Sequence, residues 1–400
     1  MRVVHCITGL SGDGAQRMLL RLVVQLQQRG IQNVVISLSK REALAHEFEK
    51  QGVPVHTLDI ARAWQIGGGL RRLHSLITEL SPDVVQGWMY HANLAVSVVV
   101  PFLRKKTPVV WNIRRGLDDY RERKFSTRAA VRLSAFVSSR ADRIIYCTHE
   151  SRTQHESFGF ASKQGLVIGN GFDTATFSPD AEMRSAIRTR LGVSDQDILI
   201  GNIGRNDSAK GRSFLFDAFA ELLHRVPHAR LLLVGRGMEE SNRELRGRLV
   251  TSRIAARVIL IGEYTPISNL YPAMDIFCSS SVAEGFPNVV AEAMASGVPC
   301  VATDTGNTKV LLQGTGIVVP TRSAQRLAEG LVAMCEQSAE QRRARGLLAR
   351  ERITTAYSLS RIADDYVSLY AEVAEKRDAS RSVHGQESGV TGVSTVFSRT

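Results

Sequence analysis

Short apolar runs recur along the chain and alternate with stretches of helical periodicity. In the first half these runs are Val3–Ile7, Val34–Leu38, Val84–Val85, Val109–Trp111, Arg143–Cys147 and Gly165–Ile168. A second series comprises Ile198–Ile203, Arg230–Val234, Val258–Ile261, Ile276–Ser279, Val298–Ala302 and Ile317–Val319. Apolar strands separated by helices are typical of a parallel sheet that is covered on both faces. The pattern therefore predicts an α/β fold with two similar halves, joined near residues 172–182.

The last part of the chain departs from this alternation. Residues 339–376 have the periodicity of two helices, with a break near Tyr357–Ser360. Beyond Lys376 the content of Ser, Gly, Thr and Arg rises and the periodicity vanishes, which predicts a disordered tail over residues 377–400. We expect a first domain over residues 1–178, a second over 179–356 and a C-terminal helix over 357–376.

Length and composition fit a globular protein of two or three domains, because the 400 residues are 44% hydrophobic. The longest apolar stretch, Ala92–Leu103, is interrupted by Asn93 and Pro101 and is too short to span a bilayer. The first residues fit a buried strand better than a signal peptide, so we expect a cytoplasmic protein. The five cysteines have no metal-ligand spacing and predict reduced thiols in the core.

The net charge of +12 implies attraction to an anionic partner, whether nucleic acid, a membrane surface or phosphorylated metabolites. Basic residues are concentrated between Arg104 and Arg143, where they form either an ordinary solvated face or a contact with an anionic surface. Nucleic acid is not an expected partner, because aromatic residues make up only 6% of the chain and no motif with stacked aromatic side chains is present.

A glycine-rich loop, "GLSGDGAQRMLL", follows the first strand and precedes a helix. Gly12 and Gly14 would let the backbone turn sharply and approach an anionic ligand at the helix N-terminus. The spacing is not that of a dinucleotide fingerprint, and the second strand ends without the acid that would hold a ribose, so NAD is disfavoured. Lys40 and Arg41 leave an NADP site open as an alternative, and a tight turn without any ligand is another.

Two cations follow the first strand of the second half, in "GNIGRNDSAKG". Arg205 and Lys210 project from the carboxyl edge of a parallel sheet, which is where open α/β sheets bind ligands. An arginine and a lysine at this edge suit a diphosphate, although a loop of this kind is often merely solvated.

Two carboxylates surround a turn in "EGFPNVVAEAMASG". Pro287 suits the first position of a helix, which places Glu284 in the preceding loop and Glu292 in the second turn. Both acids are then expected near the positive end of a helix at the same sheet edge as Arg205 and Lys210.

In this combination the sequence resembles glycosyltransferase family 4, whose members have the GT-B architecture. The matching segments are "GLSGDGAQR", "VIGNGFDTATFSP", "GRNDSAKG", "LLLVGRG", "VILIGEYTPISNLYPAMDIF" and "SSSVAEGFPNVVAEAMASGVPCVATDTGN". The most specific is the E-x7-E pattern of Glu284 and Glu292. The resemblance implies two Rossmann-like domains facing each other across a cleft, with the last helix returning to the N-terminal domain. It also implies a sugar nucleotide donor bound mainly to the C-terminal half, an acceptor bound mainly to the N-terminal half, and retention of anomeric configuration.

The resemblance also implies roles for single residues. Glu284 would contact hydroxyls of the donor sugar, Glu292 would hold the nucleotide ribose, and Arg205 with Lys210 would hold the diphosphate. His91 would lie near the reacting sugar, as a hydrogen-bonding group rather than a general base, although a buried structural histidine is as good an interpretation. Further donor contacts are expected from Gly12, Gly14, Gly235, Glu263, Tyr264 and Gly285, and from the backbone N–H groups of Phe286, Asn288 and Val289 at the helix start.

The chain departs from the family pattern at two places. Gly12-Asp13-Gly14 stands where paired glycines are usual, and Gly169 replaces the usual proline before Asn170, so the acceptor contacts are expected to differ from the family pattern. The single D-x-D string, Asp195 to Asp197, precedes a strand in an expected turn, and no essential divalent metal or other cofactor is predicted.

The resemblance thus implies a retaining glycosyltransferase that uses a UDP- or GDP-linked sugar and a hydroxyl acceptor, in surface polysaccharide or glycolipid biosynthesis. The basic 104–143 stretch adds the hypothesis of a peripheral location at the inner face of a membrane. Alternatives are a sugar nucleotide epimerase of the same fold, an NADP-dependent oxidoreductase and a non-catalytic basic binding module.

Overall fold

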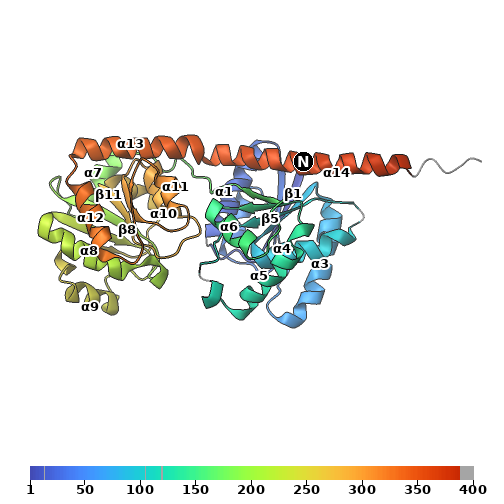
Figure 1. The fold of residues 1–400 in the computed structure, drawn as a ribbon, viewed down its shortest axis with the longest axis horizontal. Helices are drawn as coiled ribbons and strands as arrows, with labels where there is room; N and C mark the ends of the chain where they lie inside the picture. The colour runs from blue at the N-terminus through green and yellow to red at the C-terminus, as the bar shows by residue number, and fades with distance from the viewer. Residues whose placement is uncertain (13, 104, 119, 388–400) are drawn as a thin grey trace, which may run out of the picture.

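A computed structural model describes residues 1–12, 14–103, 105–118 and 120–387. The chain forms two α/β domains that lie side by side, and the last two helices run along both of them (Figure 1). The predicted α/β class and the two similar halves are confirmed.

The N-terminal domain is built on a seven-stranded sheet with the order β3-β2-β1-β4-β5-β6-β7. All neighbouring strands are parallel, as the uniformly apolar runs predicted. The strand at one edge, β3, was not predicted, because its sequence Val-His-Thr is short and only half-buried. The strands are β1 (Arg2–Ile7), β2 (Gln32–Ser37), β3 (Val55–Thr57), β4 (Val84–Trp88), β5 (Val109–Ile113), β6 (Arg143–Tyr146) and β7 (Gly165–Val167).

Helices cover both faces of this sheet. Apolar side chains of α1 and of the C-terminal helix α14 pack on one face, and those of α3, α4 and α5 pack on the other. The helices of this domain are α1 (Gly14–Gln28), α2 (Ala43–Lys50), α3 (Ile66–Leu80), α4 (Met89–Val99), α5 (Phe125–Val137) and α6 (His149–Ser157).

The C-terminal domain has a six-stranded parallel sheet with the order β10-β9-β8-β11-β12-β13, and each strand corresponds to a predicted run. The strands are β8 (Ile198–Ile203), β9 (Ala229–Val234), β10 (Val258–Ile261), β11 (Ile276–Ser279), β12 (Cys300–Thr303) and β13 (Ile317–Val319). The helices are α7 (Ala181–Arg190), α8 (Arg212–Arg225), α9 (Arg243–Thr251), α10 (Asn288–Ala295), α11 (Thr308–Leu312), α12 (Ala324–Cys335) and α13 (Ala339–Ala356).

The chain crosses between the domains twice, and the two crossings are bonded together. The first crossing passes through Phe172, and the second separates α13 from α14 (Leu359–Glu387). The N–H of Phe172 donates to the carbonyl of Tyr357 at 2.9 Å, and the N–H of Leu359 donates to the carbonyl of Phe172 at 2.8 Å. α13 packs on α10, whereas α14 packs on α1 and β4 of the N-terminal domain.

The C-terminal helix is longer than the sequence indicated. α14 continues to Glu387, so the disorder predicted to begin after Lys376 is wrong for residues 377–387. The remainder of the predicted tail, residues 388–400, lies outside the described residues.

The five cysteines are buried and unpaired, as predicted. Within the described ranges no helix is both long and apolar enough to cross a membrane.

Candidate active site

The loop after β8 is held in a fixed shape by a buried arginine. Arg212, at the start of α8, donates to the carbonyl oxygens of Gly204 and Arg205. Burial lowers the pKa of Arg212 to about 10, so this side chain stays cationic at neutral pH. Gly211 ends the loop with φ of 58°, a left-handed conformation in which a Cβ would collide with the neighbouring backbone. The loop therefore presents Arg205 and Lys210 at the carboxyl edge of the sheet.

Lys210 and Glu284 form an ion pair between two loops of the C-terminal domain. Lys210 Nζ lies 2.6 Å from Glu284 Oε1, which also accepts a hydrogen bond from Ser281 Oγ at 2.7 Å. The two charged side chains are 23% and 14% exposed. Since β8 and β11 are neighbours in the sheet, the loops that follow them meet at its edge. Two of the residues predicted from the sequence are thus in direct contact.

Arg205 belongs to the same loop but is more exposed. Its Nη2 lies 3.8 Å from Asp207 Oδ2, and the arginine side chain is 56% exposed. Behind it, the backbone at Gly204 packs so closely on Gly235, the residue after β9, that a Cβ on Gly235 would collide with the Gly204 carbonyl. Because Gly235 has no side chain, the loops that follow β8 and β9 can pack directly against each other.

The N-terminus of α10 faces the N-terminal domain. Asn288 Oδ1 accepts a hydrogen bond from Asn170 Nδ2 at 2.7 Å, and Asn288 Nδ2 lies 3.4 Å from where a Cβ on Gly14 would stand. The main-chain N–H of Asn288 donates to the carbonyl of Phe286 at 2.9 Å, so this amide is already bonded. Pro287 precedes the helix instead of beginning it, which corrects the predicted boundary by one residue.

Phe286 is a core residue, and the contact predicted for it concerns only its backbone N–H. The side chain is buried, and its ring centroid lies 5.9 Å from that of Phe172 and 6.1 Å from that of Tyr357. Val289 is half-buried and packs against the same hydrophobic cluster. These apolar contacts anchor the loop between Glu284 and α10 to the point where the chain crosses between the domains.

Glu292 lies buried between the domains. Its Oε2 accepts a hydrogen bond from the hydroxyl of Tyr271 at 3.0 Å, and its Oε1 lies 3.4 Å from Nη2 of Arg21 on α1. Burial raises the pKa of Glu292, and Arg21 and the Tyr271 hydroxyl partly offset that rise. The carboxylate is 8% exposed and has a partner on each side, so it is a rigid acceptor for further hydroxyl groups.

Gly285 brings the loop that carries Glu284 against the N-terminal domain. A Cβ on Gly285 would lie 3.0 Å from the carbonyl oxygen of Arg114 and 3.0 Å from Cα of Arg115. Cys147 Sγ lies 3.8 Å from the Gly285 carbonyl oxygen. Because Arg114 follows β5 and Cys147 follows β6, the carboxyl ends of the N-terminal strands face this loop.

Arg114 connects several elements of the N-terminal domain. Its Nη1 donates to the carbonyl of Ile168 at 2.7 Å and to Asn170 Oδ1 at 3.2 Å, and its Nη2 donates to the hydroxyl of Tyr366 on α14. Asn112 Nδ2 donates to the same hydroxyl at 2.7 Å. Since Asn170 also donates a hydrogen bond to Asn288, this network reaches the start of α10.

His91 lies in the first turn of α4, directly after β4, as the sequence predicted. Burial lowers the pKa of His91, so the ring is neutral at physiological pH. Among the described residues no hydrogen bond or ion pair joins it to Lys210 or Glu284, and its proposed contact with a donor sugar stays a prediction.

Glu263 and Tyr264 follow β10, on the far side of Gly235. The N–H of Gly235 donates to the carbonyl of Gly262 at 2.9 Å, which places the two loops side by side. Glu263 is exposed, whereas Tyr264 is half-buried and packs under the guanidinium of Arg190 at 5.8 Å.

The glycine-rich loop is also built into the site, although Asp13 lies outside the described residues. Gly12 has φ of 102°, and its carbonyl accepts a hydrogen bond from Arg17 Nε at 3.0 Å. At the other end of the loop the N–H of Leu10 donates to the carboxylate of Glu42, which also accepts from Ser39 Oγ at 3.0 Å. An anionic side chain is therefore bonded to the backbone at the start of this loop.

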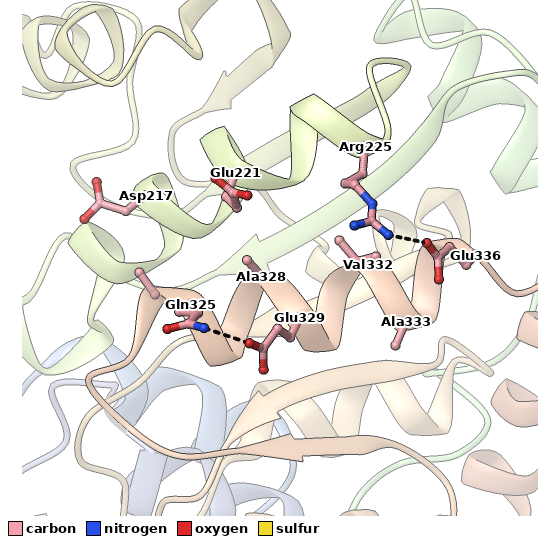
Figure 2. Close-up of a pocket in the computed structure, with 10 residues that line it drawn as sticks. Asp217, Glu221, Arg225, Gln325, Ala328, Glu329, Val332, Ala333 and Glu336 are labelled. Carbon is pink, nitrogen blue, oxygen red and sulfur yellow. Dashed lines mark hydrogen bonds and ion pairs between the residues drawn. The ribbon is translucent and has the colours of Figure 1, made fainter.

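A surface groove of about 710 Å³ between α8 and α12 contains none of the predicted site residues. Figure 2 shows Asp217, Glu221 and Arg225 on one side of it and Glu329 and Glu336 on the other. Arg225 pairs with Glu336 at 3.6 Å, which leaves the groove acidic and unsuited to a diphosphate.

Several residues at this site were not singled out from the sequence. Arg21, Tyr271, Ser281 and Asn170 each bond to a predicted residue. Arg21 lies 271 positions from Glu292 along the chain, and no local pattern marks such a contact.

Comparisons with known proteins agree with this geometry. The N-terminal domain matches the family model described as a glycosyl transferase 4-like domain over residues 13–171. The C-terminal domain matches the model described as glycosyl transferases group 1 over residues 197–337. The chain belongs to the glycosyltransferase 4-like family.

Two curated members of the family are similar to this chain over about half of its length. The lipopolysaccharide core biosynthesis mannosyltransferase LpsB of Rhizobium meliloti is 28% identical, over 53% of this chain and 60% of LpsB. The phosphatidyl-myo-inositol mannosyltransferase of Mycobacterium tuberculosis is 30% identical, over 56% of this chain and 57% of that protein. The matched region thus spans little more than half the length of these relatives.

The solved structure of Anabaena Alr3699/HepE in complex with UDP has the same fold. It superposes with a TM-score of 0.81 at 22% identity and covers 93% of this chain and 100% of that chain. The predicted GT-B fold is thereby confirmed.

Proposed function

We propose that this protein is a retaining glycosyltransferase that transfers a sugar from a nucleotide diphosphate sugar to a hydroxyl acceptor. The observation that carries the proposal is the Lys210–Glu284 ion pair, 2.6 Å long, between the loops after β8 and β11. It combines a cation suited to the leaving diphosphate with a carboxylate suited to sugar hydroxyls, next to the N-terminus of α10.

Charge development explains why these groups would accelerate the reaction. As the glycosidic bond breaks, negative charge grows on the diphosphate, and Lys210 and Arg205 would be the groups that stabilise it. Glu284 holds the Lys210 ammonium in place through a short bond before the donor arrives, so little reorganisation is needed at the moment of transfer. Each such contact contributes about 3 kcal/mol to the barrier reduction, judged from oxyanion-hole substitutions.

Glu292 suits the ribose of the nucleotide. A carboxylate offers about four lone-pair positions, and the bonds with Arg21 and Tyr271 leave acceptor capacity for hydroxyl groups. Its side chain projects from the second turn of α10, while the diphosphate would lie at the start of the same helix, where the dipole favours anions.

The names of relatives support a nucleotide sugar and a glycolipid or polysaccharide acceptor. HepE was solved with UDP, and LpsB is named as a mannosyltransferase of the lipopolysaccharide core. A UDP- or GDP-linked donor and an acceptor in surface polysaccharide or glycolipid synthesis, at the inner face of a membrane, are the corresponding proposals for this chain. No metal or other cofactor is part of the proposal.

The alternatives receive no comparable support. An NADP-dependent oxidoreductase would need the loop at Leu10 free for a phosphate, and Glu42 is bonded there. A sugar nucleotide epimerase would make the same phosphate contacts, so the two activities are distinguished by the product that each enzyme forms. Incubation with the donor alone yields an epimeric sugar nucleotide only if the protein is an epimerase.

Donor identity can be tested with a panel of nucleotide diphosphates and their sugars in a thermal-shift assay. A ligand of the predicted site raises the melting temperature of the parent protein. The same ligand should have little effect on Lys210→Ala and Arg205→Ala and an unchanged effect on the matched surface variants Lys163→Ala and Arg246→Ala. Equal shifts in all five proteins would contradict the proposed diphosphate site.

A further inference from the structure

The most exposed large apolar side chains of the described chain lie on one side of the N-terminal domain. Phe136, Phe125, Phe102 and Trp64 are 84%, 77%, 76% and 75% exposed. They belong to α5, to the turn after α4 and to the turn before α3, and these three helices pack side by side on one face of the sheet. Figure 1 shows α3, α4 and α5 on the opposite side of the domain from α14. Exposed aromatic side chains on neighbouring elements make this side of the domain a candidate interaction surface.

The pattern along α5 defines the outward face of this helix. At about 100° per residue, Phe125, Arg132 and Phe136 fall on one line along the helix, with Arg128 and Leu133 on either side of it. The residues that face the core are on the opposite side, namely Ala130, Val131 and Ser134. We call the outward residues Phe125, Arg128, Arg132, Leu133 and Phe136 the α5 face.

The charge on α5 itself has a single sign, and the acidic residues Glu122 and Asp142 lie just outside the basic segment at either end. The segment from Arg123 to Ala141 contains Arg123, Lys124, Arg128, Arg132 and Arg140 and no acidic residue. Arg132 is exposed and lies over the ring of Tyr120 at 6.0 Å, which positions its guanidinium beside the apolar stripe. Cations that alternate with aromatic and aliphatic side chains on one face are typical of a helix that lies in the interface of an anionic bilayer.

We propose that the α5 face docks on an anionic phospholipid bilayer, with the helix parallel to the membrane plane. Phe125, Leu133 and Phe136 insert among the upper acyl chains, and Arg128 and Arg132 bind the lipid phosphates. A polyanion such as RNA would satisfy the arginines but would leave Leu133 and Phe136 without an apolar partner. A bilayer uses both kinds of side chain at once.

The α5 face is connected to the candidate active site by a short, bonded segment. Arg114 and Arg115 contact Gly285, and the chain then runs from Gly116 to the start of α5. Arg123 donates to the carbonyl of Gly116 at 2.5 Å, which ties the two ends of this segment together. Docking would therefore hold the N-terminal side of the site at the lipid surface, where a lipid-linked acceptor is presented. This last step rests on the proposed function.

Co-flotation of the full chain with vesicles tests the docking directly. We expect binding at physiological salt to phosphatidylcholine vesicles that contain phosphatidylglycerol, and much less binding to phosphatidylcholine alone or at high salt. The charge variant Arg128→Gln/Arg132→Gln should bind about 30-fold more weakly, from about 1 kcal/mol per cation near an anionic surface. The apolar variant Phe125→Ser/Phe136→Ser should also lose binding.

Matched variants on the other domain serve as controls. Leu347→Ser/Leu348→Ser removes two exposed apolar side chains from α13, and Arg246→Gln/Arg343→Gln removes two exposed arginines, and both should float like the parent. Melting temperatures of all variants should stay close to that of the parent, since every changed side chain is exposed except that of Arg128, which is half-buried.

Three results would overturn the proposal: no flotation with anionic vesicles, flotation that the α5 variants do not weaken, or RNA that binds more tightly than the vesicles. A dimer in solution that the apolar variant dissociates would assign the α5 face to a second copy of the chain instead. None of these measurements requires a sugar donor, so the docking and the proposed transferase activity can fail independently.

Discussion

Arg21 of α1 and Glu292 of α10 join the two domains through an ion pair of 3.4 Å. The carboxylate is buried and bonded to Tyr271 on its own domain, whereas the guanidinium comes from the opposite domain. The charge state of a residue proposed to hold the donor therefore depends on a side chain of the acceptor-side domain.

Removal of this cation should change how donor binding depends on pH. Burial raises the pKa of Glu292, and Arg21 lowers it, so Arg21→Ala raises it further. A protonated Glu292 is a weaker acceptor for ribose hydroxyls, so donor affinity falls as the pH drops through this pKa. We expect the fall to begin at a higher pH in Arg21→Ala than in the parent, measured as the donor Kd across a pH series. Arg246→Ala should follow the parent, and parallel curves for all three proteins would refute the coupling.

The Lys210–Glu284 pair should behave as a unit in a double-mutant cycle. Lys210→Ala leaves a largely buried carboxylate without its cation, and we expect a loss of about 1–3 kcal/mol in the free energy of unfolding. Lys210→Ala/Glu284→Ala should cost less than the sum of the single changes. Each single change should also lower kcat about 100- to 1,000-fold. Urea unfolding and initial rates measure these effects, and additive stability losses would argue against a coupled pair.

Gly235 should not tolerate a side chain. It has φ of 127° and packs against the backbone of Gly204, so Gly235→Ala should lower the free energy of unfolding by about 1–3 kcal/mol and raise the donor KM. Gly247 is the matched control, because it lies exposed in α9 with open space around it. Gly247→Ala should stabilise the protein by up to about 1 kcal/mol. Similar thermal and kinetic behaviour of the two variants would show that the loop is more adaptable than its packing suggests.

Two buried histidines should make the fold sensitive to acid. Burial lowers the pKa of His5 and of His155 to about 4, against an ordinary value near 6.5. Between these values the unfolded chain binds protons that the folded chain does not, so stability is constant above about pH 7 and falls as the pH drops toward 4. The loss amounts to roughly 3 kcal/mol for each histidine. Chemical unfolding at several pH values measures it, and His155→Gln should flatten the profile between pH 7 and pH 4. An unchanged profile in this variant would contradict the assignment to His155.

The regular elements were predictable because burial on both faces leaves a signal in consecutive residues. Runs such as Ile198–Ile203 and Ile276–Ser279 coincide with the fully buried strands β8 and β11. The edge strand β3 was missed because Val-His-Thr lacks that signal, and the end of α14 was misplaced because its last residues are polar. At the site, the contact between Lys210 and Glu284 follows from strand order. The contact of Arg21 with Glu292 instead depends on how the two domains pack, and the contact of Tyr271 with Glu292 depends on how a turn packs against α10 inside the C-terminal domain. The periodicity of a single sequence records neither kind of packing.

The hydrogen bonds that join Phe172 to Tyr357 and Leu359 have a mechanical consequence. Both connections between the domains pass through a single bonded point, and Phe286 packs beside it, so a rotation of one domain against the other would be centred close to this point. Contacts close to it, such as the anchor of the Glu284 loop, would barely shift during such a rotation. Side chains far from this point would move the most during such a rotation. Molecules would therefore enter and leave the space between the domains on that side.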